Sequence, residues 1–148
     1  MKTLTFFVVC LLLMVWSREL PPEAVREREL ADMKQAAIKA LSDCDLIAIT
    51  NEATVILRNV RQCNGVVRDS EVHYESISQL QKTLDPIYLG NTWISKGTRD
   101  LPMHIVVRFG DHHLYAYIWL FGSDHEPFGM PDGAELIEHG VYFSSVNE

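Results

Sequence analysis

The residues best suited to recognition chemistry lie in two stretches, 103–109 and 113–121. Both stretches alternate aliphatic residues with aromatic, imidazole and guanidinium side chains. Because successive side chains of a strand point to opposite faces, a hairpin of these stretches would sort them onto two faces. One face would be aliphatic, with Met103, Ile105, Val107, Leu114, Ala116, Ile118 and Leu120. The other would carry His104, Val106, Arg108, His113, Tyr115, Tyr117, Trp119 and Phe121.

The second of these faces has the composition of a binding surface. Tyr, Trp and Arg dominate binding hot spots, because they combine a large apolar area with a polar tip. We therefore predict ligand- or partner-binding residues at Trp93, His104, Arg108, Tyr115, Tyr117 and Trp119. Two alternatives remain open. In the first, the sheet is covered on both faces by the protein itself. In the second, the sheet is concave and lines a small-ligand pocket, in which Arg108 would pair with an anionic group near His104 and Tyr117.

The turn between the two stretches decides whether this sorting holds. Gly110-Asp111 predicts a two-residue turn, which pairs residues whose numbers sum to 221. A four-residue turn shifts the pairing by two and keeps the same two faces, whereas a three-residue turn would mix them.

Histidines and carboxylates are frequent near the C-terminus, and such side chains build zinc sites. They are His112, His113, His125, His139, Asp111, Asp124 and Glu126. Their spacing matches no fixed zinc motif, so we predict neither a metal ligand nor a cofactor. A metal-binding envelope protein is kept as an alternative to a binding protein and to a small-ligand pocket. The chain also has no glycine-rich phosphate loop and no GxSxG motif, so catalytic residues stay unknown and a non-enzyme is favoured.

The N-terminus has the pattern of a secretory signal peptide over residues 1–17. Lys2 precedes the 13-residue run Leu4–Trp16, which is apolar apart from Thr5, and small Ser17 follows it. A membrane-spanning helix needs roughly 20 apolar residues, so this run is short for a span. We expect export to the periplasm or the extracellular space, with residues 18–148 as one domain that has no stable membrane span. An uncleaved N-terminal anchor is the alternative.

Cleavage would leave two cysteines, Cys44 and Cys63. In an oxidising compartment an even pair in a small domain usually forms a bridge, so we predict a Cys44–Cys63 disulfide. A catalytic thiol is the alternative and would need an activating histidine nearby.

The charge distribution bears on the class of partner. The net charge is −7, and no Lys or Arg follows Arg108, whereas seven acidic residues do. An acidic end repels phosphate backbones, so a nucleic-acid partner is not expected. A protein partner fits better, and a basic one would complement this charge; the alternative is a solvated acidic surface that maintains solubility. A homodimer formed by burying the sheet face is also open.

The first half of the chain predicts helices. A helix from Pro22 presents one apolar face, formed by Leu30, Met33, Ala37, Leu41 and Cys44, and a short helix through Leu84 has Ser76 as its N-cap. Residues 45–63 are ambiguous, because their β-branched residues favour a hairpin while a helical stripe also fits. The expected bridge favours the hairpin, and residues 66–74 could continue as a strand.

The last third predicts antiparallel strands at 91–96, 103–109, 113–121, 135–137 and 141–144. Helices followed by a β-meander give one α+β domain, with a long N-terminal amphipathic helix packed on a curved antiparallel sheet. In architecture alone, this order resembles cystatin-like and NTF2-like folds. We expect an exported non-catalytic binding protein, of inhibitor or immunity type, that recognises its partner through the aromatic sheet face or the acidic C-terminal end.

Overall fold

The computed structural model describes residues 22–62, 75–85 and 92–145. The predicted signal peptide and the predicted strand at 66–74 lie outside these residues. The described part is α+β, as expected. Its helices are α2 (Pro22–Ser42), α3 (Leu46–Gln62) and α4 (Glu75–Leu84), and its strands are β1 (Thr92–Ser95), β2 (His104–Gly110), β3 (Tyr115–Leu120), β4 (Ala134–Glu138) and β5 (Val141–Ser144).

The strands form one antiparallel sheet in the order β1-β2-β3-β5-β4. The expected meander is correct for β1 to β3 and wrong after that. β5 pairs with β3, and β4 lies at the outer edge. The segment from 121 to 133 therefore carries the chain past the position of β5, and the β4–β5 hairpin then returns it through Gly140, which has a φ of 74°.

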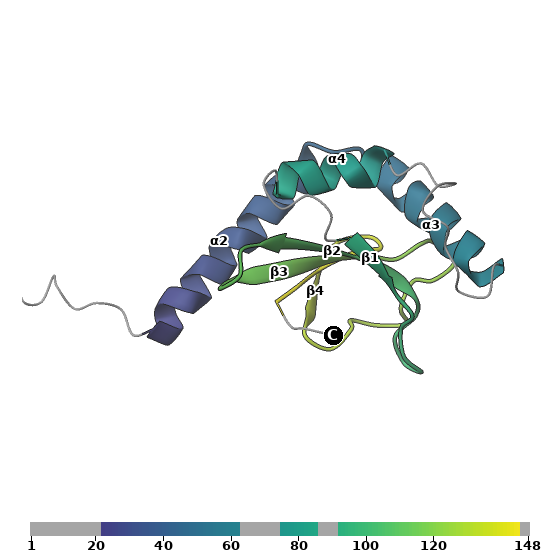
Figure 1. Cartoon of the computed structure of the whole chain (residues 1–148). Coiled ribbons are helices and arrows are strands. Elements are labelled where there is room, and N and C mark those ends of the chain that lie inside the picture. The colour runs from purple at the N-terminus through teal and green to yellow at the C-terminus, as the bar shows by residue number, and fades with distance from the viewer. Residues whose placement is uncertain (1–21, 63–74, 86–91, 146–148) are drawn as a thin grey trace, which may run out of the picture.

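The helices cover one face of the sheet (Figure 1). Their buried apolar side chains pack with the aliphatic face of β2 and β3 into the main core. The core residues include Ala37 and Leu41 of α2, Ile49, Ala53, Ile56, Leu57 and Val60 of α3, Ile77 and Leu80 of α4, and Ile105, Val107, Ile118 and Leu120 of the sheet. The aliphatic face predicted from the alternating pattern is thus confirmed as the one that the helices bury.

The predicted N-terminal helix is confirmed, although not all of it packs on the core. Met33, Ala37 and Leu41 lie against the core, whereas residues 22–32 are exposed or half-exposed. Figure 1 shows this first part of α2 extending beyond the sheet. The helix ends at Ser42, so Cys44 lies in the turn that follows it.

The hairpin expected over residues 45–63 is wrong, because this segment is helix α3. Ile49, Ala53, Ile56 and Val60 recur at helical spacing and are all buried, so burial of this stripe outweighs the strand preference of the β-branched residues. Asp45 caps the helix by accepting the N–H of Ala48 at 3.1 Å.

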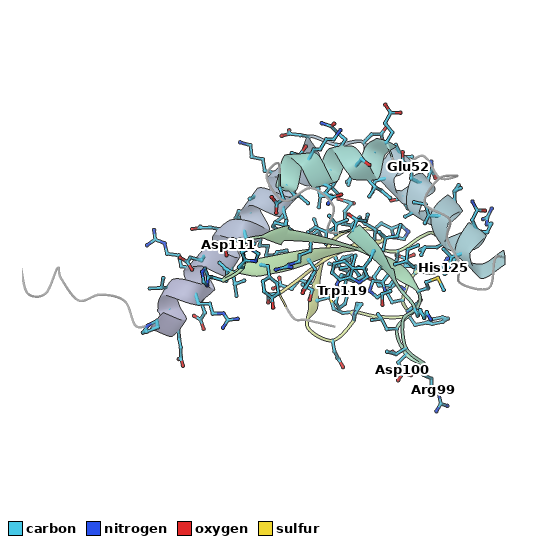
Figure 2. All side chains as sticks on the ribbon, in the orientation of Figure 1. Glu52, Arg99, Asp100, Asp111, Trp119 and His125 are labelled. Atoms are coloured by element: carbon cyan, nitrogen blue, oxygen red, sulfur yellow. The ribbon has the colours of Figure 1, made fainter. Side chains whose placement is uncertain are left out.

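Glu52 of α3 ties this helix to α4. Its carboxylate accepts the backbone N–H groups of Ser76, at 2.8 and 3.0 Å, and of Ile77, at 3.0 Å. These are N–H groups at the start of α4, which have no acceptor within the helix itself. The cap therefore comes from Glu52, labelled in Figure 2, and not from Ser76 as the sequence predicts.

The predicted disulfide involves Cys63, which lies outside the described residues. The hairpin that favoured this bridge is replaced by helix α3, and the bridge itself stays a prediction. Among the described residues Cys44 is a free thiol, and its pKa is raised by burial and by the nearby Asp43 carboxylate.

Membrane spanning can be judged for the described helices. None of them, in the ranges 22–62 and 75–85, combines the length and the apolar character that a bilayer span requires.

Candidate recognition site

The β2–β3 turn has four residues, 111–114, instead of the two that Gly110-Asp111 predicts. The register runs from Ile105 opposite Leu120 to Gly110 opposite Tyr115. Asp111 closes the turn, because its Oδ1 accepts the backbone N–H groups of residue 113, at 2.7 Å, and residue 114, at 2.8 Å. The N–H groups of residues 114 and 113, in that order, also lower the pKa of Asp111. The four-residue turn keeps the two predicted faces apart.

The face away from the helices has its own apolar cluster. It contains Val106, Tyr117, Trp119, Phe121, Ala134 and Tyr142, with Leu101 and Tyr115 packed against them. Figure 2 shows Trp119 on the opposite side of the sheet from the helices. The second predicted face therefore exists, and it also packs together.

One cross-strand row on this face runs through all five strands. Trp93 lies opposite Val106, Val106 opposite Trp119, Trp119 opposite Tyr142, and Tyr142 opposite Leu136. Side chains directly opposite in an antiparallel pair share a face. Trp93 is 41% exposed and Leu136 51%, while the three residues between them are buried. The face is thus closed in its centre and open at both edges.

The segment between β3 and β4 lies under the closed part of the face (Figure 1). Its first residues pack on α3. A Cβ on Gly122 would lie 2.8 Å from the Cα of Thr54, and the N–H of Ser123 donates to Thr54 Oγ1 at 3.0 Å. Arg58 of α3 pairs with Asp124 at 2.6 Å, and the resulting hydrogen bond lowers the pKa of Asp124.

The remainder of this segment is attached to the β4–β5 hairpin. Glu126 pairs with His139 at 2.9 Å, and Ser144 Oγ donates to the carbonyl of Gly133 at 3.1 Å. Leu101, from the segment between β1 and β2, adds an apolar contact to the cluster. Two connecting segments of the protein, and not its helices, therefore cover the centre of the face.

Two predicted site residues, His104 and Trp119, lie in the covered centre. His104 is fully buried, with its ring centroid 5.1 Å from that of Trp119 and 4.8 Å from that of Phe121. Its Nδ1 lies 2.9 Å from the carbonyl oxygen of Pro102, and a carbonyl accepts, so this nitrogen carries the proton. Trp119 is buried too, and its Nε1 has no hydrogen-bond partner within the described part of the chain.

The predicted pocket would need His104, Arg108 and Tyr117 to face one ligand. His104 and Arg108 are four residues apart on β2, which is roughly 13 Å along an extended strand. His104 and Tyr117 are also both buried. These positions do not support a common small-molecule site.

The other predicted residues form a contiguous group, which we call the aromatic rim: Trp93, Arg108, Tyr115 and Tyr117. Trp93 is exposed, Arg108 and Tyr115 are half-buried, and Tyr117 is buried between its neighbours. The ring of Tyr117 has two edge-to-face neighbours, Trp93 with centroids 5.9 Å apart and Tyr115 with centroids 5.8 Å apart. The Cζ of Arg108 lies 4.3 Å from the centre of the Tyr115 ring, within the range of a cation–π contact. Trp93 belongs to the edge strand β1, so its ring is open to solvent on one side.

The late histidines do not form a metal site in the described residues, where no three His, Cys, Asp or Glu side chains come close enough to hold an ion. His125 is buried, His139 pairs with Glu126, and His112 and His113 are exposed at the β2–β3 turn.

A second exposed apolar group is not anticipated from the sequence. We call it the apolar loop, residues 127–131 (Pro-Phe-Gly-Met-Pro). Phe128 is fully exposed and Met130 largely so. Prolines and Gly129 are typical of a loop, but two large apolar residues are unusual in a solvated one. Phe128 and Met130 are therefore the signal in the sequence that could have pointed to this group.

Comparisons with known proteins do not assign the site. The sequence matches no protein-family model, and no curated protein and no solved structure is found to be similar to the chain.

Proposed function

We propose that this chain is an exported, non-catalytic binding protein that recognises a partner protein through the aromatic rim. The observation that carries the proposal is the set of edge-to-face contacts that runs from Trp93 on edge strand β1 to Tyr117 and Tyr115 on β3, with Arg108 over the last ring. Rings that are already oriented lose little conformational freedom on binding, and aromatic and Arg side chains supply most of the energy at protein interfaces.

The chemistry of the rim favours binding over catalysis. It offers apolar area and one guanidinium, without a carboxylate or an imidazole among its four residues to move a proton. A guanidinium matches the planar geometry of a carboxylate, so Arg108 fits an acidic side chain of the partner. Export is part of the proposal because of Lys2, the apolar run Leu4–Trp16 and Ser17.

The test combines capture with affinity measurement. The protein is immobilised, an extract of the compartment into which it is exported is passed over it, and the retained partner is purified and titrated by calorimetry. We expect Trp93→Ala to weaken that affinity about 30-fold, which corresponds to the roughly 2 kcal/mol of a binding hot spot.

The matched control is Val25→Ala. Val25 is 39% exposed, close to the 41% of Trp93, but it lies on the part of α2 that extends away from the sheet. The control should leave the affinity unchanged. Equal affinities for the Trp93→Ala variant and the unmodified protein would refute the role of the aromatic rim.

A further inference from the structure

The apolar loop brings its exposed side chains next to the outer sheet edge. The N–H of Leu136, on edge strand β4, lies 3.2 Å from the Sδ of Met130. Phe128, Met130 and Leu136 are all exposed large apolar residues. Together they form an apolar protrusion from the protein, whereas isolated exposed apolar residues need no explanation.

The base of this loop is held in place, and its tip at Phe128 and Gly129 is exposed. Before the tip, Ser123 bonds Thr54, Asp124 pairs with Arg58, and Glu126 pairs with His139. After it, the buried Ala134 donates to the carbonyl of Pro131 at 3.1 Å. At the tip, a Cβ on Gly129 would meet nothing within 4 Å. A fixed base with an exposed aromatic tip lowers the entropy lost when the tip enters a pocket.

The surroundings of the loop are acidic. Asp132 and Glu138 are exposed, and neither has an ion-pair partner among residues 22–62, 75–85 and 92–145. Of the two neighbouring acids, Glu135 forms an ion pair with Lys34, and Glu126 contacts the His139 ring. No Lys or Arg follows Arg108 in the chain. The apolar tip is therefore flanked by uncompensated negative charge, which favours a positively charged surface as its counterpart.

We propose that Phe128 and Met130 insert into an apolar pocket of a partner protein, and that Lys and Arg side chains around the pocket face Asp132 and Glu138. This rests on the proposed function, because it adds a second contact to the same partner. Trp93 and Leu136 end the same cross-strand row, four strand spacings or about 19 Å apart. A standard interface covers about 800 Å² of each partner, roughly 30 Å across, so one partner spans both edges.

A protein pocket fits the loop better than a lipid surface. Anionic headgroups would be repelled by Asp132 and Glu138, whereas membrane-binding loops carry basic residues beside their apolar tips. The proposed partner is therefore a protein whose pocket is surrounded by Lys and Arg side chains, opposite in charge to the residues beside the loop.

The experiment places the photo-crosslinking residue p-benzoylphenylalanine at position 128, in cells that make the protein. A second sample carries it at position 25 as the control. We expect one protein to be crosslinked from position 128 and not from position 25. The purified protein should bind Phe128→Ser at least tenfold more weakly, with an unchanged circular dichroism spectrum because Phe128 contacts little of the fold. Asp132→Asn with Glu138→Gln should also weaken binding and reduce its dependence on salt.

Four results would overturn the inference. One is the lack of an adduct specific to position 128, and another is an adduct partner that binds Phe128→Ser as tightly as the unmodified protein. The third is binding to vesicles of equal phosphatidylcholine and phosphatidylglycerol that Phe128→Ser abolishes, which would assign the loop to lipid. The fourth is a dimer in light scattering that the same substitution dissociates, which would assign it to a second copy.

The two proposals fail separately. If Trp93→Ala weakens binding of the crosslinked protein and Phe128→Ser does not, the aromatic rim stands and the loop inference falls. If Phe128→Ser weakens binding and Trp93→Ala does not, the loop contact stands and the role of the rim falls.

Discussion

Gly122 allows the segment that covers the aromatic face to approach α3, so Gly122→Ala tests the cover directly. The new Cβ would lie 2.8 Å from the Cα of Thr54, 3.1 Å from its Oγ1 and 3.2 Å from its backbone nitrogen. Two of these atoms belong to the helix backbone, which cannot rotate away as a side chain does. The chain at residue 122 must therefore move outward, and this would lengthen the 3.0 Å bond from the Ser123 N–H to Thr54 Oγ1.

The size of the effect follows from this contact. Forcing an extra methyl into a packed site costs about 1–3 kcal/mol. For a domain of this size, a loss of about 2 kcal/mol lowers Tm by roughly 6–10 °C. The assay is thermal unfolding followed by circular dichroism, supported by urea unfolding at constant temperature.

The matched control is Gly129→Ala, in the same segment. A Cβ there meets nothing within 4 Å, so this variant should unfold within about 1 °C of the unmodified protein or slightly above it, because alanine restricts the unfolded chain. Equal Tm values for Gly122→Ala and Gly129→Ala would refute the close packing of the covering segment on α3.

Three further predictions concern titrating groups. Backbone N–H groups lower the pKa of Asp111. Its carboxylate therefore stabilises the fold above the ordinary pKa of ~4, and this effect is lost as the pH falls through the lowered pKa. In Asp111→Ala, the midpoint of urea unfolding should accordingly depend less on pH on the acid side. Burial, and then Glu126, raise the pKa of Tyr142. This phenol should therefore stabilise the fold below about pH 10 and lose that effect as the pH rises through the raised pKa, and Tyr142→Phe should remove a step above the ordinary range from an ultraviolet tyrosine titration. Burial and Asp43 raise the pKa of the Cys44 thiol, so an aromatic disulfide reagent should react slowly with this thiol at neutral pH and faster with it in Asp43→Asn. If the reagent detects Cys44 only after reduction, the residue is in a disulfide.

The sorting of the two sheet faces could be predicted because it depends on local geometry. Side chains alternate along any strand, so the separation of Ile105 and Val107 from Val106 and Arg108 survives any even error in the register. The observed pairs sum to 225 and not to the predicted 221, so each cross-strand partner lies four residues from its predicted position. The helical stripe of α2 was recognisable for the same reason, since Met33, Ala37 and Leu41 repeat along one chain segment.

Features set by contacts between distant segments could not be predicted. Helix α3 was missed because its β-branched residues favour strands locally, while its stability comes from packing on a sheet that begins some 30 residues later. The expected Cys44–Cys63 bridge then reinforced the wrong choice. The burial of His104 and Trp119 depends on connecting segments, whose course no periodic pattern specifies.

Fluorine NMR of protein labelled with 5-fluorotryptophan tests the central claim most directly, because it reports separately on the exposed Trp93 and the buried Trp119. The resonances are assigned with Trp→Phe variants, and the purified partner is then added. We predict that the Trp93 resonance shifts and loses its contact with solvent, while the Trp119 resonance keeps its position. A Trp93 that stays as exposed in the complex as in the free protein would contradict recognition through the aromatic rim.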